Sequence, residues 1–238
     1  MNFSNNEIRY VVVNRLYTCY YNPESSKEIS KIYQVCKMFK NSINDKLEYF
    51  KSLYFILNTN EELQTAVNEW CDNQAVALRK YGHISLWLTG NITDMSNLFQ
   101  NKRNFNDCIK DWDTSAVTNM CGMFYDAFKF NQPLNNWNTS SVTIMGHMFH
   151  NAKSFNQPLN NWDTSSVTSM NYMFCFAFKF NQGLNDWDTS SVTNIDSIFY
   201  NAKSFNQCLN DWDTSSVTNM SDMFKNSNMS VLPNWYTI

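Results

Sequence analysis

Tryptophan recurs along this chain at a fixed interval of 25 residues, and the other hydrophobic positions keep register with it. When Trp is taken as position 1 of the repeat, position 6 is Val or Ile and position 13 is Phe in every copy. Since the copies share their apolar columns, each must bury them against the same columns of its neighbours. The pattern predicts a tandem-repeat solenoid, whose tryptophans are Trp87, Trp112, Trp137, Trp162, Trp187 and Trp212.

Two short elements are predicted inside each repeat. Apolar positions 9, 12, 13 and 16 have the i, i+3, i+4, i+7 spacing of a short helix with one buried face, with the Thr at position 7 as a plausible N-cap. Polar and apolar residues alternate around Trp, from position 25 to position 3, as in a short strand with one face buried. The predicted fold class is therefore an α/β repeat solenoid, a leucine-rich-repeat-like coil with one strand and one helix per repeat.

The extent of the repeat divides the chain into three regions. Residues 1–60 form an N-terminal, mainly helical segment, with a strand at 8–20 and two helices within 26–57. Residues 61–86 form a helical cap on the solenoid, with two short helices up to Gly82, which ends the second, and with Asn60 as N-cap of the first. Residues 87–238 form the solenoid of six repeats, the last of them shortened.

The best-defined polar feature is a pair of columns on either side of Trp, at positions 25 and 2. With Trp inward, both columns point outward, and we call them the acidic face. Stacked carboxylates repel one another by roughly 1 kcal/mol or less per exposed pair in water, so the face must be well solvated or neutralised. Its members are Asp111, Asp113, Asn136, Asn138, Asn161, Asp163, Asp186, Asp188, Asp211 and Asp213.

Three interpretations of the acidic face stay open: a solvated surface, a contact surface for a basic protein partner, or a low-affinity calcium site. Calcium needs six or more oxygen ligands and a suitable loop, which the sequence does not guarantee. No metal and no cofactor is assigned to the chain.

Two further columns have a structural and a functional interpretation. Asn at position 20, next to a buried Phe, is expected to satisfy backbone groups of the turn rather than a ligand. At position 17, aromatic and basic residues alternate between successive copies, as in Phe128 and Lys153. Duplication of a 50-residue pair of repeats explains the alternation, and the edge also suits a partner surface.

The sequence contains no recognisable catalytic motif, and no catalytic residue is assigned. The chain has only 3 histidines and 5 glycines, and no nucleophile elbow, zinc-protease motif or phosphate-binding glycine loop. His147, His150 and Cys175 are the one set that could approach a metal, but no fourth ligand accompanies them.

Composition excludes several classes of protein. The net charge of −3 and the absence of basic runs do not indicate nucleic-acid binding. The N-terminus has neither a signal peptide nor a membrane-spanning segment, so no membrane insertion is expected. The 7 cysteines are odd in number and form no CxxC pair, which indicates reduced thiols.

The consensus W-D-T-S-S-V-T-x-M-x-x-M-F-x-x-A-x-x-F-N-Q-x-L-N resembles the BspA-like leucine-rich-repeat surface-protein family, a mycoplasma-type domain of unknown function. The resemblance covers about residues 61–235, including Trp70 and Tyr81-Gly82 in the lead-in. It implies a non-catalytic repeat of bacterial surface proteins and adhesins, also carried by large DNA viruses and protists. Because this chain has no signal or lipobox cysteine, a cytoplasmic or virion protein is expected.

The functional hypothesis is a non-catalytic protein-interaction or structural repeat protein, intracellular or virus-encoded, that binds a protein partner through the acidic face. The partner's identity and the oligomeric state do not follow from the sequence. One alternative is an extracellular surface protein or adhesin at the cell surface, as in the bacterial relatives. A second alternative, an enzyme or metal-binding protein, requires residues 1–60 to form a cleft with the region from His147 to Cys175.

Overall fold

The computed structural model describes residues 55–236, which belong to the second of two compact units, Phe55–Ile238. The strand expected at 8–20 and the helices expected within 26–57 lie outside the described residues, apart from 55–57. That short piece is extended, and Ile56 forms a parallel bridge with Leu88 of the first repeat.

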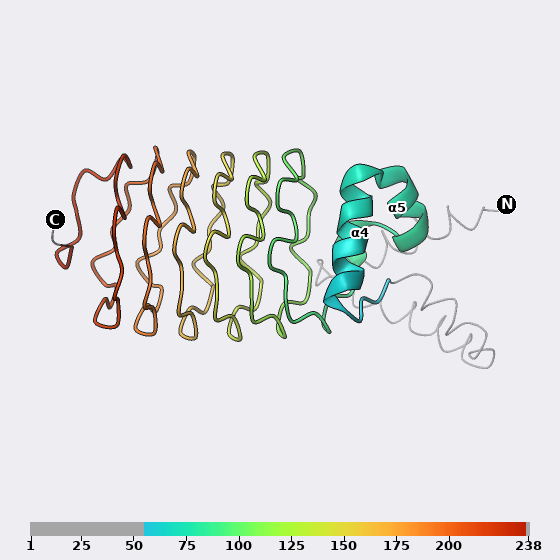
Figure 1. The fold of residues 1–238 in the computed structure, drawn as a ribbon, viewed down its shortest axis with the longest axis horizontal. Helices are drawn as coiled ribbons and strands as arrows, with labels where there is room; N and C mark the ends of the chain where they lie inside the picture. Colours follow the sequence, from blue (N-terminus) through green and yellow to red (C-terminus); the bar gives the residue numbers. More distant parts are fainter. Residues whose placement is uncertain (1–54, 237–238) are drawn as a thin grey trace, which may run out of the picture. The chain divides into compact units, whose positions relative to one another are not determined.

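Two helices precede the repeats, and they lie at one end of the stack that the repeats form (Figure 1). Helix α4 spans Asn60–Asp72 and helix α5 spans Gln74–Tyr81, where Gly82 follows with a positive φ of 73°. A single turn of 3-10 helix, η3, covers Ile84–Leu86. The N-cap of α4 is Thr59, whose hydroxyl accepts from the Glu62 N–H, so the expectation that Asn60 would cap it is wrong.

Asn60 instead satisfies the open edge of the first repeat. Its side-chain oxygen accepts from the backbone N–H groups of Thr93 at 3.2 Å and Asp94 at 3.3 Å. Gln64, one turn later on α4, donates to the Leu98 carbonyl at 3.2 Å. Side chains of α4 thus replace the hydrogen bonds that a preceding repeat would make, as a capping element must.

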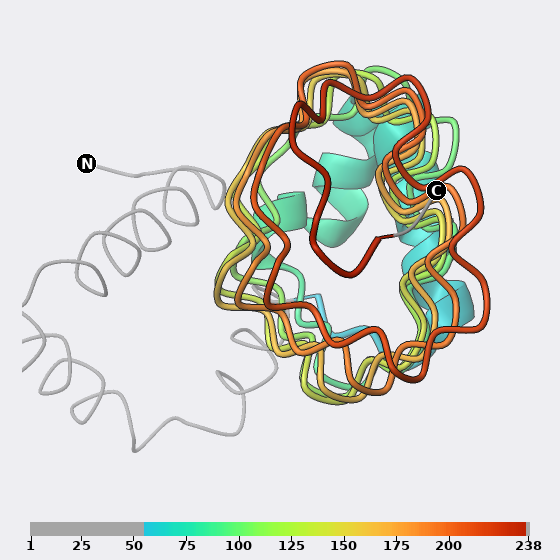
Figure 2. The ribbon, with the colours of Figure 1, turned by 90° about the vertical axis from the view of Figure 1, so that its left-hand side faces the viewer.

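Each 25-residue repeat is one coil, and the coils stack side by side (Figures 1 and 2). They are joined by isolated parallel bridges at position 8, from Asp94 to Asn119 and onward to Asn219. The strand expected at positions 25 to 3 is therefore misplaced, since pairing occurs eight positions into the repeat. Among the described residues the coils pair only through such bridges and form no longer strand.

The helix expected in each repeat is also wrong, because positions 10 to 15 form consecutive turns. In one coil the Met148 N–H donates to the Met145 carbonyl and the His150 N–H donates to the His147 carbonyl. These i→i+3 bonds are characteristic of β-turns. Positions 11 and 15 have positive φ, as in Asn97 at 56° and Asn101 at 63°, which no α-helix tolerates.

The turns orient the peptide groups so that neighbouring coils share a one-way set of hydrogen bonds. N–H groups at positions 9, 11, 13 and 15 donate to the carbonyls at positions 8, 10, 12 and 14 of the next coil. For example, the Met120 N–H donates to Ile144 at 2.9 Å, and the Phe124 N–H donates to Met148 at 2.8 Å. Along positions 8 to 15, each coil therefore presents donors to the coil that follows and acceptors to the coil that precedes, whereas at position 7 the N–H donates to the preceding coil, as Thr143 does to Thr118.

The core consists of stacked aromatic columns. Phe124 stacks on Phe149 of the next coil with centroids 5.5 Å apart, and on Phe130 of its own coil at 4.0 Å. Burial of such rings removes a large apolar area from water. The apolar columns at positions 1, 6, 9, 12, 13 and 16 point inward as the sequence predicts, apart from the half-buried Val217 and Met220 of the last coil and Lys102 at position 16 of the first.

Buried polar groups of the core are paired across coils. The indole N–H of Trp162 donates to the carbonyl of Leu134, 28 residues earlier in the chain, at 2.9 Å, and the later tryptophans repeat this bond. Thr at position 3 is also buried, and the Thr139 hydroxyl donates to the Asp163 carbonyl of the next coil at 2.8 Å. Each repeat thus satisfies polar atoms that burial would otherwise penalise.

The turn conformation gives a first prediction, at position 15 of the fifth coil. Asn201 has a φ of 56°, so Asn201→Ala should lower the free energy of unfolding by about 1 kcal/mol because alanine resists the left-handed region. Asn201→Gly should stay within about 0.5 kcal/mol of the parent. Urea unfolding followed by tryptophan fluorescence measures both. A helix would reverse the order, with Ala favoured over Gly.

The indole hydrogen bond gives a second prediction. Trp162→Phe retains an aromatic ring but leaves the buried Leu134 carbonyl without its donor, which should cost about 1–3 kcal/mol of stability. The matched control is Trp235→Phe, since Trp235 makes the same bond from a half-buried site at the end of the stack. Urea unfolding measures the free energy of unfolding of both variants. If the two substitutions lowered it equally, burial of the unpaired carbonyl would not be the cause of the loss.

Candidate functional site

Each coil has three exposed corners, and each corner is a β-turn closed by an i→i+3 hydrogen bond. In the third coil the bonds run from Val142 to Thr139, from Phe155 to Ala152, and from Trp162 to Leu159, at 2.9 to 3.1 Å. The anchoring residues are buried, so the two central residues of each turn project outward. Stacking therefore produces three ridges of side chains, at positions 4–5, 17–18 and 24–25.

The acidic face follows the corner at positions 24–25 and continues to position 2. All ten of its predicted members are exposed, and they flank the buried Trp column. The structure thus places these residues together as two parallel columns. Their role in binding stays a prediction.

Carboxylates at position 2 are held by the serine two residues later. In Asp163, Oδ1 accepts from the Ser165 N–H at 3.0 Å and from the Ser165 hydroxyl at 2.6 Å. These bonds lower the pKa of Asp163, and the same side-chain bond lowers the pKa of Asp113 and Asp188. The carboxylates are therefore ionised at neutral pH. Asn138 makes the same turn with its amide oxygen, so the turn itself needs no charge.

Position 25 is held by the asparagine of the preceding coil. The Asn161 N–H donates to the Asn135 side chain at 3.0 Å, and the Asp211 N–H donates to the Asn185 side chain at 3.2 Å. Asn185 also donates through its amide nitrogen to Asp211 Oδ2. The backbone of the acidic face is therefore fixed, while its charged groups face solvent.

The asparagines at position 20 form the structural ladder that the sequence suggests. The Asn156 side-chain oxygen accepts from the Asn181 N–H at 2.9 Å, and the Asn131 and Asn181 side chains accept from the following coil in the same way. Gln182 adds a second bond to Asn156 from position 21. The prediction that these asparagines satisfy backbone groups is therefore confirmed.

The two histidines of the third coil lie in an aromatic stack and do not form a metal site with Cys175. Their ring centroids are 5.7 Å apart, His150 stacks on Tyr125 at 4.5 Å, and His147 stacks on Tyr172 at 4.8 Å. Across residues 55–236, no three His, Cys, Asp or Glu side chains come together in a metal-binding arrangement. Burial raises the pKa of Cys175 to about 12, so its thiol is protonated.

Both imidazoles are held neutral. Burial, with His147 as a second cause, lowers the pKa of His150 to about 4, and burial also lowers the pKa of His147. The Nδ1 atoms of both rings are buried and lack a hydrogen-bond partner within the described part of the chain. Protonation of either ring would place a charge in a poorly solvated position.

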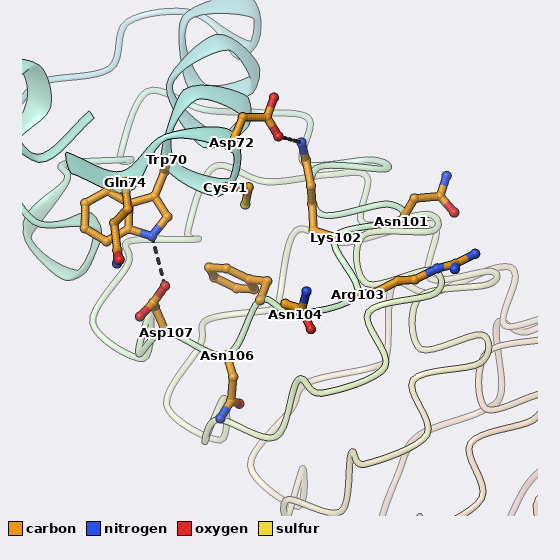
Figure 3. Close-up of a pocket in the computed structure, with 11 residues that line it drawn as sticks. Trp70, Cys71, Asp72, Gln74, Asn101, Lys102, Arg103, Asn104, Asn106 and Asp107 are labelled. Carbon is orange, nitrogen blue, oxygen red and sulfur yellow. Dashed lines mark hydrogen bonds and ion pairs between the residues drawn. The ribbon is translucent and has the colours of Figure 1, made fainter. Parts of the chain in front are cut away.

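A hollow of about 620 Å³ lies where the end of α4 meets the first coil (Figure 3). Two contacts cross it: Lys102 pairs with Asp72 at 3.1 Å, and the Trp70 indole donates to Asp107 at 2.9 Å. Cys71 lines it as well, but burial raises the pKa of this thiol to about 11. The Cys71 thiol is therefore not an activated nucleophile, and of the charged groups that line the hollow, Asp72 and Lys102 pair with each other.

One regular feature escaped the sequence analysis, because it alternates between two positions. The corner at positions 17–18 carries one basic residue in each of five consecutive coils, sometimes at 17 and sometimes at 18. Considering the two positions together would have revealed it. We call this set the cation ridge: Arg103, Lys129, Lys153, Lys179 and Lys203.

One family model matches the chain twice, over residues 72–174 and 135–235, and its description reads Mycoplasma protein of unknown function, DUF285. No curated protein and no solved structure matches the chain. Of the helices described, none has the length and apolar character needed to cross a membrane.

The neutral histidines give a prediction about pH. An unfolded chain protonates His150 near its ordinary pKa of 6.5, whereas the folded chain does so near 4. Stability should therefore fall as the pH drops from 7 toward 5, and part of this loss should disappear in His150→Tyr. After discounting for solvent screening, that part is at most about 1 kcal/mol.

Tyrosine suits the test because two other coils carry Tyr125 and Tyr200 in the same column. Urea unfolding of parent and variant at pH 7 and at pH 5 measures the difference. An identical loss of stability in both proteins would show that His150 does not resist protonation.

Proposed function

This chain belongs to the family described as Mycoplasma protein of unknown function, DUF285, and on the geometry of its corners we propose that it is a non-catalytic interaction module. Its coils hold the acidic face in a fixed array for a protein partner with a basic surface. The observation that carries the proposal is the position-2 column, where a serine fixes each of three ionised aspartates in the same conformation.

A fixed array favours recognition over simple solvation. Side chains that are already ordered lose less conformational entropy on binding, which leaves more of the interaction energy for affinity. Complementary charge also accelerates encounter with a partner of opposite sign. The densest part of the face is formed by two neighbouring coil junctions, with Asp186, Asp188, Asp211 and Asp213.

We also propose that the stack is a leucine-rich-repeat-like solenoid, and that the chain is a BspA-like relative. Support comes from the parallel bridge in each coil, the inward apolar columns and the helical cap at one end. The non-catalytic assignment is supported by the raised pKa of Cys71 and Cys175, whose thiols are protonated and not activated as nucleophiles. An intracellular or virion setting is part of the proposal, and the free cysteines of the described region support it.

The test replaces the four aspartates of the densest part with asparagine: Asp186→Asn, Asp188→Asn, Asp211→Asn and Asp213→Asn, which we call the acid-neutral variant. Asn138 already occupies this face with the same turn, so the fold should persist. We expect partners captured by the parent from its native extract to be lost, or weakened at least about tenfold. Quantitative affinity capture with mass spectrometry measures this, after unfolding curves have verified the fold.

The control variant carries Lys80→Gln and Lys225→Gln, two cations of surface ion pairs away from the acidic face. It should retain the partners. If the acid-neutral variant captured the same partners with the same yield as the parent, the acidic face would not be the binding surface.

A further inference from the structure

The cation ridge is a regular row of positive charges, of which Lys203 donates through Nζ to the Asn226 carbonyl at 3.0 Å. Its corner turn is closed in every coil, for example by the Phe130 N–H on the Ala127 carbonyl at 3.1 Å and by the Phe180 N–H on the Ala177 carbonyl at 3.1 Å. The buried Phe at position 19 anchors the turn, and the neighbouring rings of this column lie 5.8 to 6.0 Å apart. The ridge therefore presents one cation per coil at about that spacing.

These cations have no carboxylate partner within residues 55–236. Lys80 pairs with Glu69, Lys102 with Asp72, and Lys225 with Asp222, and none of these ion pairs involves the ridge. Four of the five ridge residues are exposed, and the fifth, Lys153, is half-exposed. Since the whole chain is net negative, at −3, a row of five cations is a concentrated exception.

Intramolecular contacts hold part of the ridge in place. Arg103 lies 5.0 Å from the Phe128 ring centroid, and Lys153 lies 4.2 Å from the same ring. The Lys129 N–H donates to the Arg103 carbonyl of the coil before it at 3.1 Å. Because cations already occupy the faces of Phe128, the ring is not free to stack on a nucleotide base. The ridge therefore selects a partner by charge and spacing.

From this geometry we infer that the cation ridge docks the acidic face of a second copy of this chain. Position 2 of the acidic face recurs once per coil, like the ridge, and is a carboxylate in four of its five copies, Asp113, Asp163, Asp188 and Asp213. In two stacks lying side by side, these carboxylates therefore run along the cation row with the same coil spacing. No other partner is guaranteed the same spacing. The inference rests on the proposed function, because it uses the acidic face and names its partner.

The two surfaces lie on different corners of the coil, so docking is heterologous. Each copy that offers its ridge to one neighbour still offers its acidic face to another, so the assembly grows beyond a dimer, into a closed ring or an open filament. Individual exposed ion pairs are weak, so the association depends on several coils acting together and is sensitive to salt.

The test uses a ridge-neutral variant, with Lys129→Gln, Lys153→Gln, Lys179→Gln and Lys203→Gln, beside the acid-neutral variant. At about 50 mM salt the parent should form species larger than a dimer, and these should dissociate at about 300 mM as screening shortens the reach of the charges. Each variant alone lacks one of the two surfaces and should stay monomeric. An equimolar mixture should form a 1:1 dimer that grows no further. Sedimentation velocity measures all four samples.

A parent that is monomeric at low salt, or a mixture that stays monomeric, would overturn the inference. The Lys80→Gln, Lys225→Gln control should associate like the parent. If the parent stayed monomeric while the acid-neutral variant lost its captured partners, the proposed function would stand and only self-docking would fail. Binding of a polyglutamate peptide to the monomeric parent, and not to the ridge-neutral variant, would assign the ridge to a different acidic protein.

Discussion

Each of the first five coils donates four backbone N–H groups, at positions 9, 11, 13 and 15, to carbonyls of the coil that follows. For these groups to point in one direction, the chain must take positive φ at positions 11 and 15, as it does at Tyr172 and Asn151. The coil is therefore built of turns, and its spacing is fixed by hydrogen bonds and not by side-chain size. At the first coil no preceding coil supplies these bonds, so Gln64 of α4 donates to the Leu98 carbonyl, and Asn60 accepts from the N–H groups of Thr93 and Asp94.

The regular spacing determines what lies inside and outside. Rings that recur at the same position stack on their own copies, as Phe149 does on Phe174 at 5.6 Å. Corners recur in the same way, so that a single charged residue in the repeat becomes a row of charges on the surface. The acidic face and the cation ridge both arise because the same corner is repeated in successive coils. Both are anchored by buried residues at the ends of their turns.

Several of these features could be predicted from sequence, and others could not. The inward columns, from Trp87 to Phe224, follow from invariance among the copies, and so does the exposure of positions 25 and 2. The helix prediction failed because successive turns also bring positions 9, 12, 13 and 16 to the inside. Asparagine at position 15 indicated turns and not a helix, since asparagine tolerates the left-handed region. It occurs there as Asn101, Asn151 and Asn201. The serine bonds to position 2 depend on turn geometry that hydrophobic spacing does not reveal.

Amide hydrogen exchange resolved to single residues tests the one-way ladder most directly. The account predicts slow exchange at Met145, His147, Phe149 and Asn151, whose N–H groups reach the next coil. It predicts fast exchange at the equivalent positions of the last coil, Met220, Asp222, Phe224 and Asn226, which have no following coil in the described residues. Equal protection of the two sets, or rapid exchange at both, would contradict it.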